Sequence, residues 1–412
     1  MKPTNEILKK YAELIARTGV NVQKGQVVTL TASVEEHAFA CLVMEECYKA
    51  GAKKVNIDWS CDQQTRLNYI YADEDVLGTT LPWEEAKLKQ MVEDLPCRIF
   101  IESEDPDALA GLDPEKLSSV MQQRGIVRKP YRDAIDGKHQ WLIAAIPSPA
   151  WAKKCFPDCD EETAVEKLWD AILKTVRVDE AGDPVAQWQA HTDFMIEKAE
   201  WLNAQKFTSL HYTSSNGTDF KVELIPDAKW EGAKAVNNLN GAAYIPNMPT
   251  EECFCMPDKD NVNGIVYASK PLNYSGKVIE NFWFKFENGA VVDYGAEKGL
   301  DALTNLIETD EGSKHLGEVA LISYDSPISN LNILFFNTLF DENASCHLAL
   351  GRCYPENIQG GVDMSEEELL AAGGNQSMNH VDFMFGTSDM EVTGIQEDGT
   401  EVTVFHNGNF VF

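Results

Sequence analysis

Basic residues are few in this sequence relative to acidic ones. Its 412 residues include 35 Lys and Arg against 66 Asp and Glu, which gives a formal net charge of −31 at pH 7. Nucleic-acid phosphates and anionic lipid headgroups repel such an acidic surface, so both are poor candidate partners. The same excess leaves a second use of the carboxylates open, which is to hold cations.

The sequence also lacks the segments that would direct it into or across a membrane. No stretch approaches the roughly 18 consecutive apolar residues of a membrane span. The N-terminus, MKPTNEILKKYAEL, resembles a charged amphipathic helix rather than the apolar core of a signal peptide. The ten cysteines include no CxxC pair and do not suggest a disulfide framework in a chain of this length. We therefore expect a cytoplasmic protein whose cysteines are mostly buried free thiols.

Phosphate-binding loops are absent from the first half of the chain. Neither GxGxxG nor GxxxxGK[ST] follows any of its predicted strands. These strands are short and apolar, and helical segments separate them, which is typical of parallel pairing in an α/β sheet. The predicted strands lie at 27–31, 54–59, 98–102 and 141–146.

The pattern changes after Lys206, where strands become frequent and turn signals lie close together. Asn288-Gly289, Asp398-Gly399 and Asn407-Gly408 favour hairpins, because these dipeptides tolerate positive φ. One clear helix is predicted at 296–307. We expect an α/β + α+β architecture. An N-terminal α/β domain with a parallel sheet spans 1–198, and a mainly antiparallel α+β metal-binding domain spans 199–412.

His380 and Asp382 form the first candidate ligand pair. They stand in Asn379-His380-Val381-Asp382-Phe383, an otherwise apolar segment. Side chains alternate along a strand, so a His-x-Asp sequence places both groups on one face. Such a pair is half of a metal site. The structural alternative is the exposed face of an ordinary strand.

His347 is the second candidate histidine. It opens the apolar segment His347-Leu348-Ala349-Leu350-Gly351, with Glu342 a few residues upstream and Tyr354 shortly after. A histidine in this setting is more often a satisfied core residue than a ligand. A tyrosine before proline is usually structural, although its phenol can also donate to a developing oxyanion. The other histidines, His191 among them, show no ligand-type neighbour and are interpreted as surface or capped side chains.

Two glutamates complete the set. Glu252 follows Glu251 in the proline-flanked segment MPTEECFCMP, and Glu318 begins the apolar segment Glu318-Val319-Ala320-Leu321. Each glutamate alone is weak evidence, because solvated glutamate is the norm. Together, however, four segments of one antiparallel domain supply Glu, Glu, His and His-x-Asp at strand ends. Such ligands suit a pair of divalent cations, and Zn, Co and Mn are all compatible with imidazole and carboxylate.

These segments resemble the thermophilic-type metalloaminopeptidases, the family of aminopeptidases T, S and II. The matching stretches are NMPTEE at 247–252, PDKDNVNGIVYASKPL at 257–272, GEVAL at 317–321, FFNTLFDENASCHLALG at 335–351 and NHVDFMFG at 379–386. The resemblance spans nearly the whole chain. It implies a two-metal site formed by Glu252, Glu318, His347, His380 and Asp382. It also implies that Glu342, as ligand or general base, and Tyr354, as ligand or oxyanion partner, belong to the active centre.

The sequence departs from the family pattern at its cysteines. Cys255 replaces a small hydroxyl residue after the PTEE loop, and Cys346 and Cys353 flank the predicted His347 and Tyr354. Thiolates are soft, strong ligands, so these cysteines leave an altered metal preference or oxidative sensitivity open.

The function expected from the resemblance is a dinuclear metalloaminopeptidase. It would hydrolyse N-terminal residues from peptides through water activated by two metals, with Glu251 or Glu342 anchoring the free α-amine of the substrate. The resemblance also implies a homodimer. The alternatives are a two-metal hydrolase of another ester or amide, such as a phosphoesterase, and a non-catalytic acidic binding protein.

Overall fold

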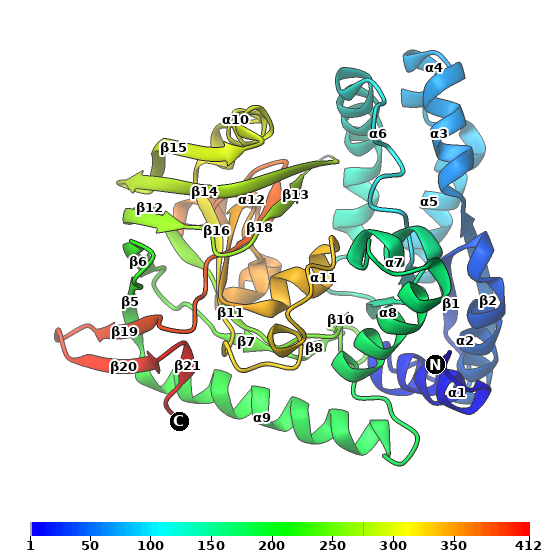
Figure 1. The fold of residues 1–412 in the computed structure, drawn as a ribbon, viewed down its shortest axis with the longest axis horizontal. Coiled ribbons are helices and arrows are strands. Elements are labelled where there is room, and N and C mark those ends of the chain that lie inside the picture. The colour runs from blue at the N-terminus through cyan, green and yellow to red at the C-terminus, as the bar shows by residue number, and fades with distance from the viewer. Residues whose placement is uncertain (1, 275) are drawn as a thin grey trace. The chain divides into compact units, whose positions relative to one another are not determined.

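The computed structural model describes residues 2–274 and 276–412, which form two compact units (Figure 1). Unit 1 comprises Met1–Gln189 and Lys234–Pro249, and unit 2 comprises Ala190–Ala233 and Thr250–Phe412. This division differs from the single predicted boundary between residues 198 and 199.

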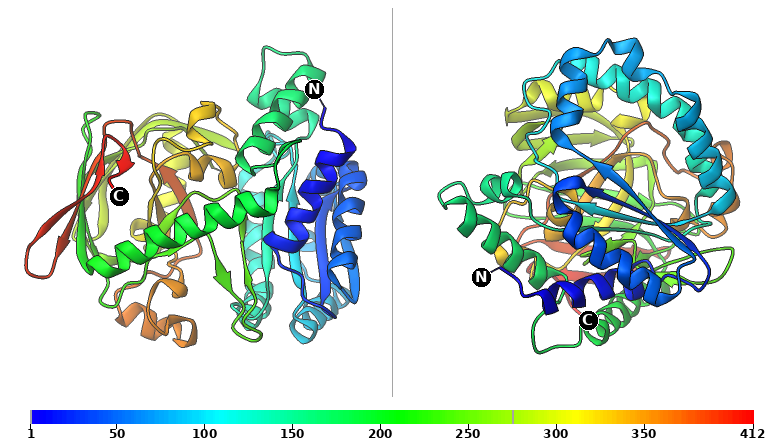
Figure 2. Two further views of the ribbon diagram at one scale, coloured as in Figure 1. Left: turned by 90° about the horizontal axis from the view of Figure 1, so that it is seen from below. Right: turned by 90° about the vertical axis from the view of Figure 1, so that its right-hand side faces the viewer.

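Two features of the chain explain the difference in the boundary. Helix α9 (Pro184–Gln205), the long green helix of Figures 1 and 2, contains the change from unit 1 to unit 2. Strand β10 (Asn247–Met248) then returns to unit 1 and pairs with β4 (Trp141–Ala145). The predicted boundary rests on a change in the pattern of strands and turns along the sequence. Such a change shows neither a helix that continues through the boundary nor a strand that pairs with one about a hundred residues earlier.

Unit 1 contains the predicted parallel sheet, with the strand order β10-β4-β3-β1-β2. All of its pairings are parallel, and β1 pairs with both β2 and β3. The alternating burial of β1 places Val28 and Leu30 in the core, and β1 packs against α2. Gly51, at φ 111°, ends α2 in the left-handed conformation that glycine adopts without a steric cost.

The remaining elements of unit 1 follow in chain order. They are α1 (Asn5–Leu14), the π-helix η1 (Ile15–Gly19), β1 (Val27–Ser33), the short 3₁₀ helix η2 (Val34–Glu36), α2 (His37–Ala50), β2 (Lys54–Ser60), α3 (Asp62–Tyr71), α4 (Glu74–Gly78), α5 (Pro82–Asp94), β3 (Cys97–Glu102), α6 (Pro114–Ile135), α7 (Pro149–Cys155), α8 (Glu161–Thr175), β8 (Ala235–Val236) and β9 (Ala243–Tyr244).

Unit 2 contains two antiparallel sheets, as predicted for the second half of the chain. One has the order β18-β17-β16-β11-β7. The other has the order β13-β14-β12-β6-β5-β19-β20-β21, and β15 pairs with β14. One face of the first sheet packs on the second sheet through aromatic and branched side chains. For example, the ring centroids of Phe284 on β14 and Phe383 on β18 lie 4.9 Å apart. The opposite face of the first sheet is therefore available for polar groups.

The elements of unit 2 also follow in chain order. They are β5 (Phe207–Thr213), β6 (Asp219–Leu224), β7 (Glu231–Gly232), β11 (Cys253–Cys255), β12 (Pro257–Tyr267), β13 (Leu272–Tyr274), β14 (Lys277–Glu287), β15 (Ala290–Lys298), α10 (Leu300–Ile307), the 3₁₀ helix η3 (Glu311–Lys314), β16 (Leu316–Leu321), η4 (Ser329–Leu331), α11 (Thr338–Asp341), η5 (Glu342–Ala344), β17 (His347–Gly351), η6 (Pro355–Asn357), η7 (Gly361–Asp363), α12 (Glu366–Ala371), β18 (His380–Met384), β19 (Glu391–Gln396), β20 (Glu401–His406) and β21 (Asn409–Phe410).

The helix predicted at 296–307 begins later than expected. Strand β15 continues to Lys298 in register with β14, and Gly299, at φ 74°, makes the change of direction before α10 begins at Leu300. The pairing with β14 decides this boundary, and the helical spacing of apolar residues in one segment cannot show it.

The structure agrees with the sequence on membrane-spanning helices and on disulfides. Within the described part of the chain, no helix combines the length and the apolar character that a membrane crossing requires. All ten cysteines are free, and six of them are buried. The expected buried thiols are therefore present.

Candidate metal centre

The strands of the first sheet of unit 2 place the predicted ligands on a single face. In the ladder, Glu318 of β16 pairs with Ala349 of β17, which pairs with Asp382 of β18. Paired residues point to the same side of a sheet, and so do residues two apart along one strand. His347 and His380 therefore share this face with Glu318 and Asp382. The small Ala349 at the centre leaves space above the sheet.

The other face of the same strands is apolar. Leu348, Val319 and Phe383 alternate with the ligand positions and are buried in the core that joins the two sheets. This alternation fixes the orientation of the site, because a register slip of one residue would turn the ligands into the hydrophobic core and the apolar side chains toward the site. The sequence HLALG is thus a ligand-bearing strand with one face in the hydrophobic core.

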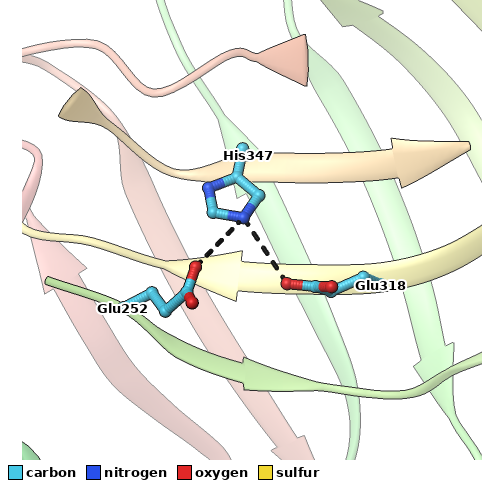
Figure 3. A group of neighbouring side chains, drawn as sticks. All are labelled: Glu252, Glu318 and His347. Carbon is cyan, nitrogen blue, oxygen red and sulfur yellow. Dashed lines mark ion pairs between the residues drawn. The ribbon is translucent and has the colours of Figure 1, made fainter. Parts of the chain in front are cut away.

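The first ligand group consists of Glu252, Glu318 and His347, from three neighbouring strands or their ends (Figure 3). The Nε2 atom of His347 lies 3.4 Å from Oε2 of Glu252 and 3.5 Å from Oε1 of Glu318. Glu252 immediately precedes β11, which pairs with β16. All three residues are buried.

The second ligand group consists of Glu318, His380 and Asp382. The Nε2 atom of His380 lies 3.3 Å from Oε2 of Glu318 and 3.5 Å from Oδ1 of Asp382. Glu318 thus belongs to both groups. One of its oxygens faces His347 and the other faces His380. A carboxylate in this position can link two cations.

Backbone carbonyls orient both imidazole rings. The Nδ1 atom of His347 lies 2.9 Å from the carbonyl oxygen of Glu342, and Nδ1 of His380 lies 2.6 Å from that of Arg352. A carbonyl only accepts, so each Nδ1 must donate its hydrogen. Nε2 of each ring is thereby directed at the carboxylates. Metal-binding histidines are commonly held by this kind of contact.

The carboxylates and imidazoles strongly shift one another's pKa. Burial by itself raises the pKa of Glu318, but hydrogen bonding with His347 and His380 outweighs burial and lowers it to about 2. Burial likewise acts to lower the pKa of His347, yet Glu318, Asp382 and Glu252 raise it to about 10. Burial raises the pKa of Glu252 to about 8, reinforced by Glu318 and Asp382. The cluster therefore stabilises positive charge at its centre.

The spacing of the ligand atoms fits divalent metal ions. Ligands about 2.1 Å from a tetrahedral centre lie about 3.4 Å from one another. Each imidazole contacts two carboxylates, and the four distances between Nε2 and the carboxylate oxygens range from 3.3 to 3.5 Å. Imidazole nitrogen and carboxylate oxygen are also the ligand types that Zn, Co and Mn accept.

Glu342 lies beside the two ligand groups without belonging to either. It is the first residue of η5, and it lines a cavity of about 50 Å³ together with Asp382. Burial raises the pKa of its carboxyl group well above the usual value, and the charges of Asp382 and Glu252 raise it further. A carboxyl group with this proton affinity suits the holding or transfer of a proton.

Tyr354 lies over the second ligand group. Its ring centroid is 4.5 Å from that of His380, and it precedes η6. Although 40% of the residue's surface is exposed, desolvation raises the pKa of the phenol well above 10, and the charges of Glu318 and Asp382 add to this effect. Tyr354 therefore keeps its proton and can donate a hydrogen bond.

The cysteines near the site point away from it. Cys346 and Cys255 are buried in the core on the opposite face of the sheet, and Cys353 packs with Met256 in a separate apolar cluster. Burial raises the pKa of Cys346 to about 12 and raises that of Cys353 as well. These thiols remain protonated at neutral pH, so the departures from the family pattern place no thiolate among the ligands.

Two residues that support the site were missed in the sequence. His191 was interpreted as a surface or capped histidine. The surface placement is wrong, because its side chain is 7% exposed, and its Nε2 is capped by the carbonyl of Thr250 at 2.8 Å and lies 3.8 Å from Glu251. Asn343 is fully buried, and its side-chain oxygen accepts from the Glu251 amide at 2.7 Å. Both contacts join segments far apart in the chain, so no local pattern signals them.

A larger cavity, of about 350 Å³, lies in unit 1 near Gln26, Lys53 and Asn237. None of the described residues that line it is a predicted site residue. The chemistry of the ligand cluster is therefore assigned to unit 2, and size alone does not identify the functional cavity.

Known proteins resemble this chain in sequence and in fold. The chain is 44% identical to aminopeptidase AmpS of Bacillus subtilis over 413 residues, with full coverage of both chains. It is 39% identical to aminopeptidase 2 of Geobacillus stearothermophilus over 406 residues, covering 98% of each. The solved structure of wild-type AmpT from Thermus thermophilus matches with a TM-score of 0.91 and 37% identity, covering 99% of each chain.

The family comparison covers nearly the whole sequence. Residues 4–410 match the family described as thermophilic metalloprotease (M29), which confirms the resemblance inferred from the sequence motifs. A metalloprotease uses a divalent metal ion, and the two groups that Glu318 joins are candidates to hold one. The chain belongs to the thermophilic metalloprotease (M29) family.

Proposed function

We propose that the protein is a metal-dependent aminopeptidase that removes N-terminal residues from peptides at a centre holding two divalent cations. The observation that carries this proposal is the shared carboxylate of Glu318, which contacts His347 with one oxygen and His380 with the other. The names of the aminopeptidase relatives support the substrate class.

Each cation is assigned its own ligands. Glu252, Glu318 and His347 would hold one, and Glu318, His380 and Asp382 would hold the other, with Zn, Co and Mn as candidate metals. Bound cations of this kind lower the pKa of water and polarise a carbonyl.

Glu342 transfers the proton of the reaction, and Tyr354 stabilises the negative charge that forms on the substrate. Glu342 accepts a proton from the attacking water and passes it to the leaving amine, in keeping with its raised pKa. Tyr354 donates its phenolic hydrogen to the oxyanion that develops on the scissile carbonyl. Both residues approach the ligand cluster from segments outside its sheet.

The acidic lining of the cavity explains why a free N-terminus is the expected substrate. Glu342 and Asp382 line it where it meets the ligand cluster, and a peptide α-ammonium, which is a cation, would lie at this side of it rather than inside it. Glu251 is the weaker anchor for this group, because it lies against His191. The same acidic lining disfavours phosphoester substrates, which are anions. A cytoplasmic homodimer stays a prediction, and light scattering of the purified protein would check the dimer.

The test combines metal removal with two matched substrates. Protein depleted by a chelator and then reloaded with Zn, Co or Mn is assayed with leucine p-nitroanilide and with its N-acetylated counterpart. The proposal expects turnover of the free-amine compound only, and only after reloading. Equal turnover of both compounds would contradict it.

Site variants distinguish an enzyme from a non-catalytic acidic binding protein. Glu318→Gln and His380→Ala should abolish turnover in metal-loaded protein while the fold remains intact. Glu401→Gln and His406→Ala are the controls, since both residues are exposed on β20 in the other sheet. Unchanged activity in both site variants would rule out the proposed centre.

A further inference from the structure

The cavity beside the ligand cluster has an acidic side and an apolar side. Asp382 and Glu342 line it where it meets the cluster, and Leu272, Phe336 and Met384 contribute apolar surface. All of these residues belong to unit 2. Because Asp382 belongs to both the ligand cluster and the cavity lining, a peptide whose first carbonyl reaches the cluster has this cavity beside it.

Phe336 has an unusual backbone conformation. It lies between η4 and α11, and its φ of 56° is in the left-handed region that bulky side chains seldom adopt. Conformations of this kind persist where the surroundings determine them, and they gather at functional sites. The surroundings of Phe336 supply such a determinant.

The carboxylate of Asp341 holds the backbone on both sides of Phe336. One of its oxygens accepts from the Phe335 amide at 2.8 Å and the other from the Asn337 amide at 3.1 Å. The ring of Phe335 is fully buried and stacks on Phe340 with centroids 4.7 Å apart. The preceding side chain is thus fixed in the interior, while Phe336 itself is only partly buried and lines the cavity.

We propose that Phe336 is a specificity-determining residue, whose ring closes the cavity that receives the first side chain of the substrate. This inference rests on the proposed aminopeptidase function. The cavity takes apolar side chains of limited size, because its volume is about 50 Å³ and much of its lining is apolar. It rejects Asp and Glu at the N-terminus, because an ionised side chain would lose its hydration in a cavity whose described lining residues include no cationic side chain. Asp341 is a positioning residue that holds the ring in place.

The experiment measures kcat/KM for p-nitroanilides of Ala, Leu, Phe and Glu with the metal-loaded full chain. Phe336→Ala should raise the ratio of the Phe substrate to the Ala substrate by about tenfold or more, because pocket fit alone discriminates by about 10- to 200-fold. The change should come mainly from KM. Phe336→Leu should give an intermediate ratio, and the Glu substrate should stay poor in every variant.

Leu300→Ala is the matched control, because Leu300 is 48% exposed at the start of α10 and does not line the cavity. Its Phe-to-Ala ratio should equal that of the wild type. Asp341→Asn should shift the ratio in the same direction as Phe336→Ala. If Phe336→Ala and Phe336→Leu turn over substrate with the wild-type ratio, the inference is wrong while the proposed function stands. If the wild type cleaves none of the four compounds, both fail.

Discussion

The shared carboxylate of Glu318 should be a large source of stability in metal-free protein. Its pKa falls from 4.5 to about 2, because hydrogen bonds and charge from His347 and His380 outweigh the cost of burial. Each unit of pKa shift corresponds to about 1.4 kcal/mol, so the ionised carboxylate contributes up to ~3 kcal/mol to folding at pH 7. Glu318→Gln removes this charge and leaves both imidazoles with one carboxylate fewer.

The pH dependence of this contribution follows from the direction of the shift. The folded-state pKa is depressed, so the contribution is fully present above pH 4.5 and is lost as the pH falls through about 2. The difference in the free energy of unfolding between wild type and Glu318→Gln should therefore be about 3 kcal/mol at pH 7 and should shrink between pH 4.5 and pH 2.

Hydrogen exchange in the presence of a chelator measures the effect where it arises. Peptides from β16 and β17 report the opening of unit 2, which avoids treating a two-unit chain as a single two-state system. The exposed Glu401→Gln serves as the control and should shift opening by less than about 0.5 kcal/mol. A shift of that small size for Glu318→Gln at pH 7 would refute the electrostatic reasoning.

The remaining predictions concern catalysis and the core. Tyr354→Phe should lower kcat by about 10²-fold with little change in KM, because only the hydrogen bond to the developing oxyanion is lost, and steady-state kinetics would show the split. A rise in KM as large as the fall in kcat would contradict the role of Tyr354 as a donor to the oxyanion. Glu342→Gln should lower kcat by about 10²- to 10⁴-fold and remove the limb of the pH profile that rises with deprotonation of the raised carboxyl. If the rising limb of the pH profile persists in Glu342→Gln, the limb belongs to another group. Leu348→Ala should destabilise unit 2 by about 2–5 kcal/mol in urea unfolding, because Leu348 is fully buried beneath the ligands. The exposed Val292→Ala should cost less than about 0.5 kcal/mol.

Local patterns were sufficient where one strand carries the whole signal. The His380-x-Asp382 spacing predicts two side chains on one face, and the ladder shows them there. The apolar strands between helices in the first half predict parallel pairing, which the sheet of unit 1 confirms. In both cases the information lies within a few residues, so backbone geometry alone connects the sequence to the arrangement.

The sequence by itself determined that the chain is acidic, that its halves differ in strand pairing, and that His347, His380 and Asp382 are of ligand type. Only the tertiary structure decided which groups meet. The pairing of β16 with β17 brings Glu318 between the two histidines. The pairing of β10 with β4 places residues 234–249 in unit 1, which no change in the sequence pattern indicates. His191 and Asn343 support the site from remote segments, and Asp341 holds Phe336 at the cavity. Strand register and long-range contacts make these choices, because both depend on residues that lie far apart along the chain.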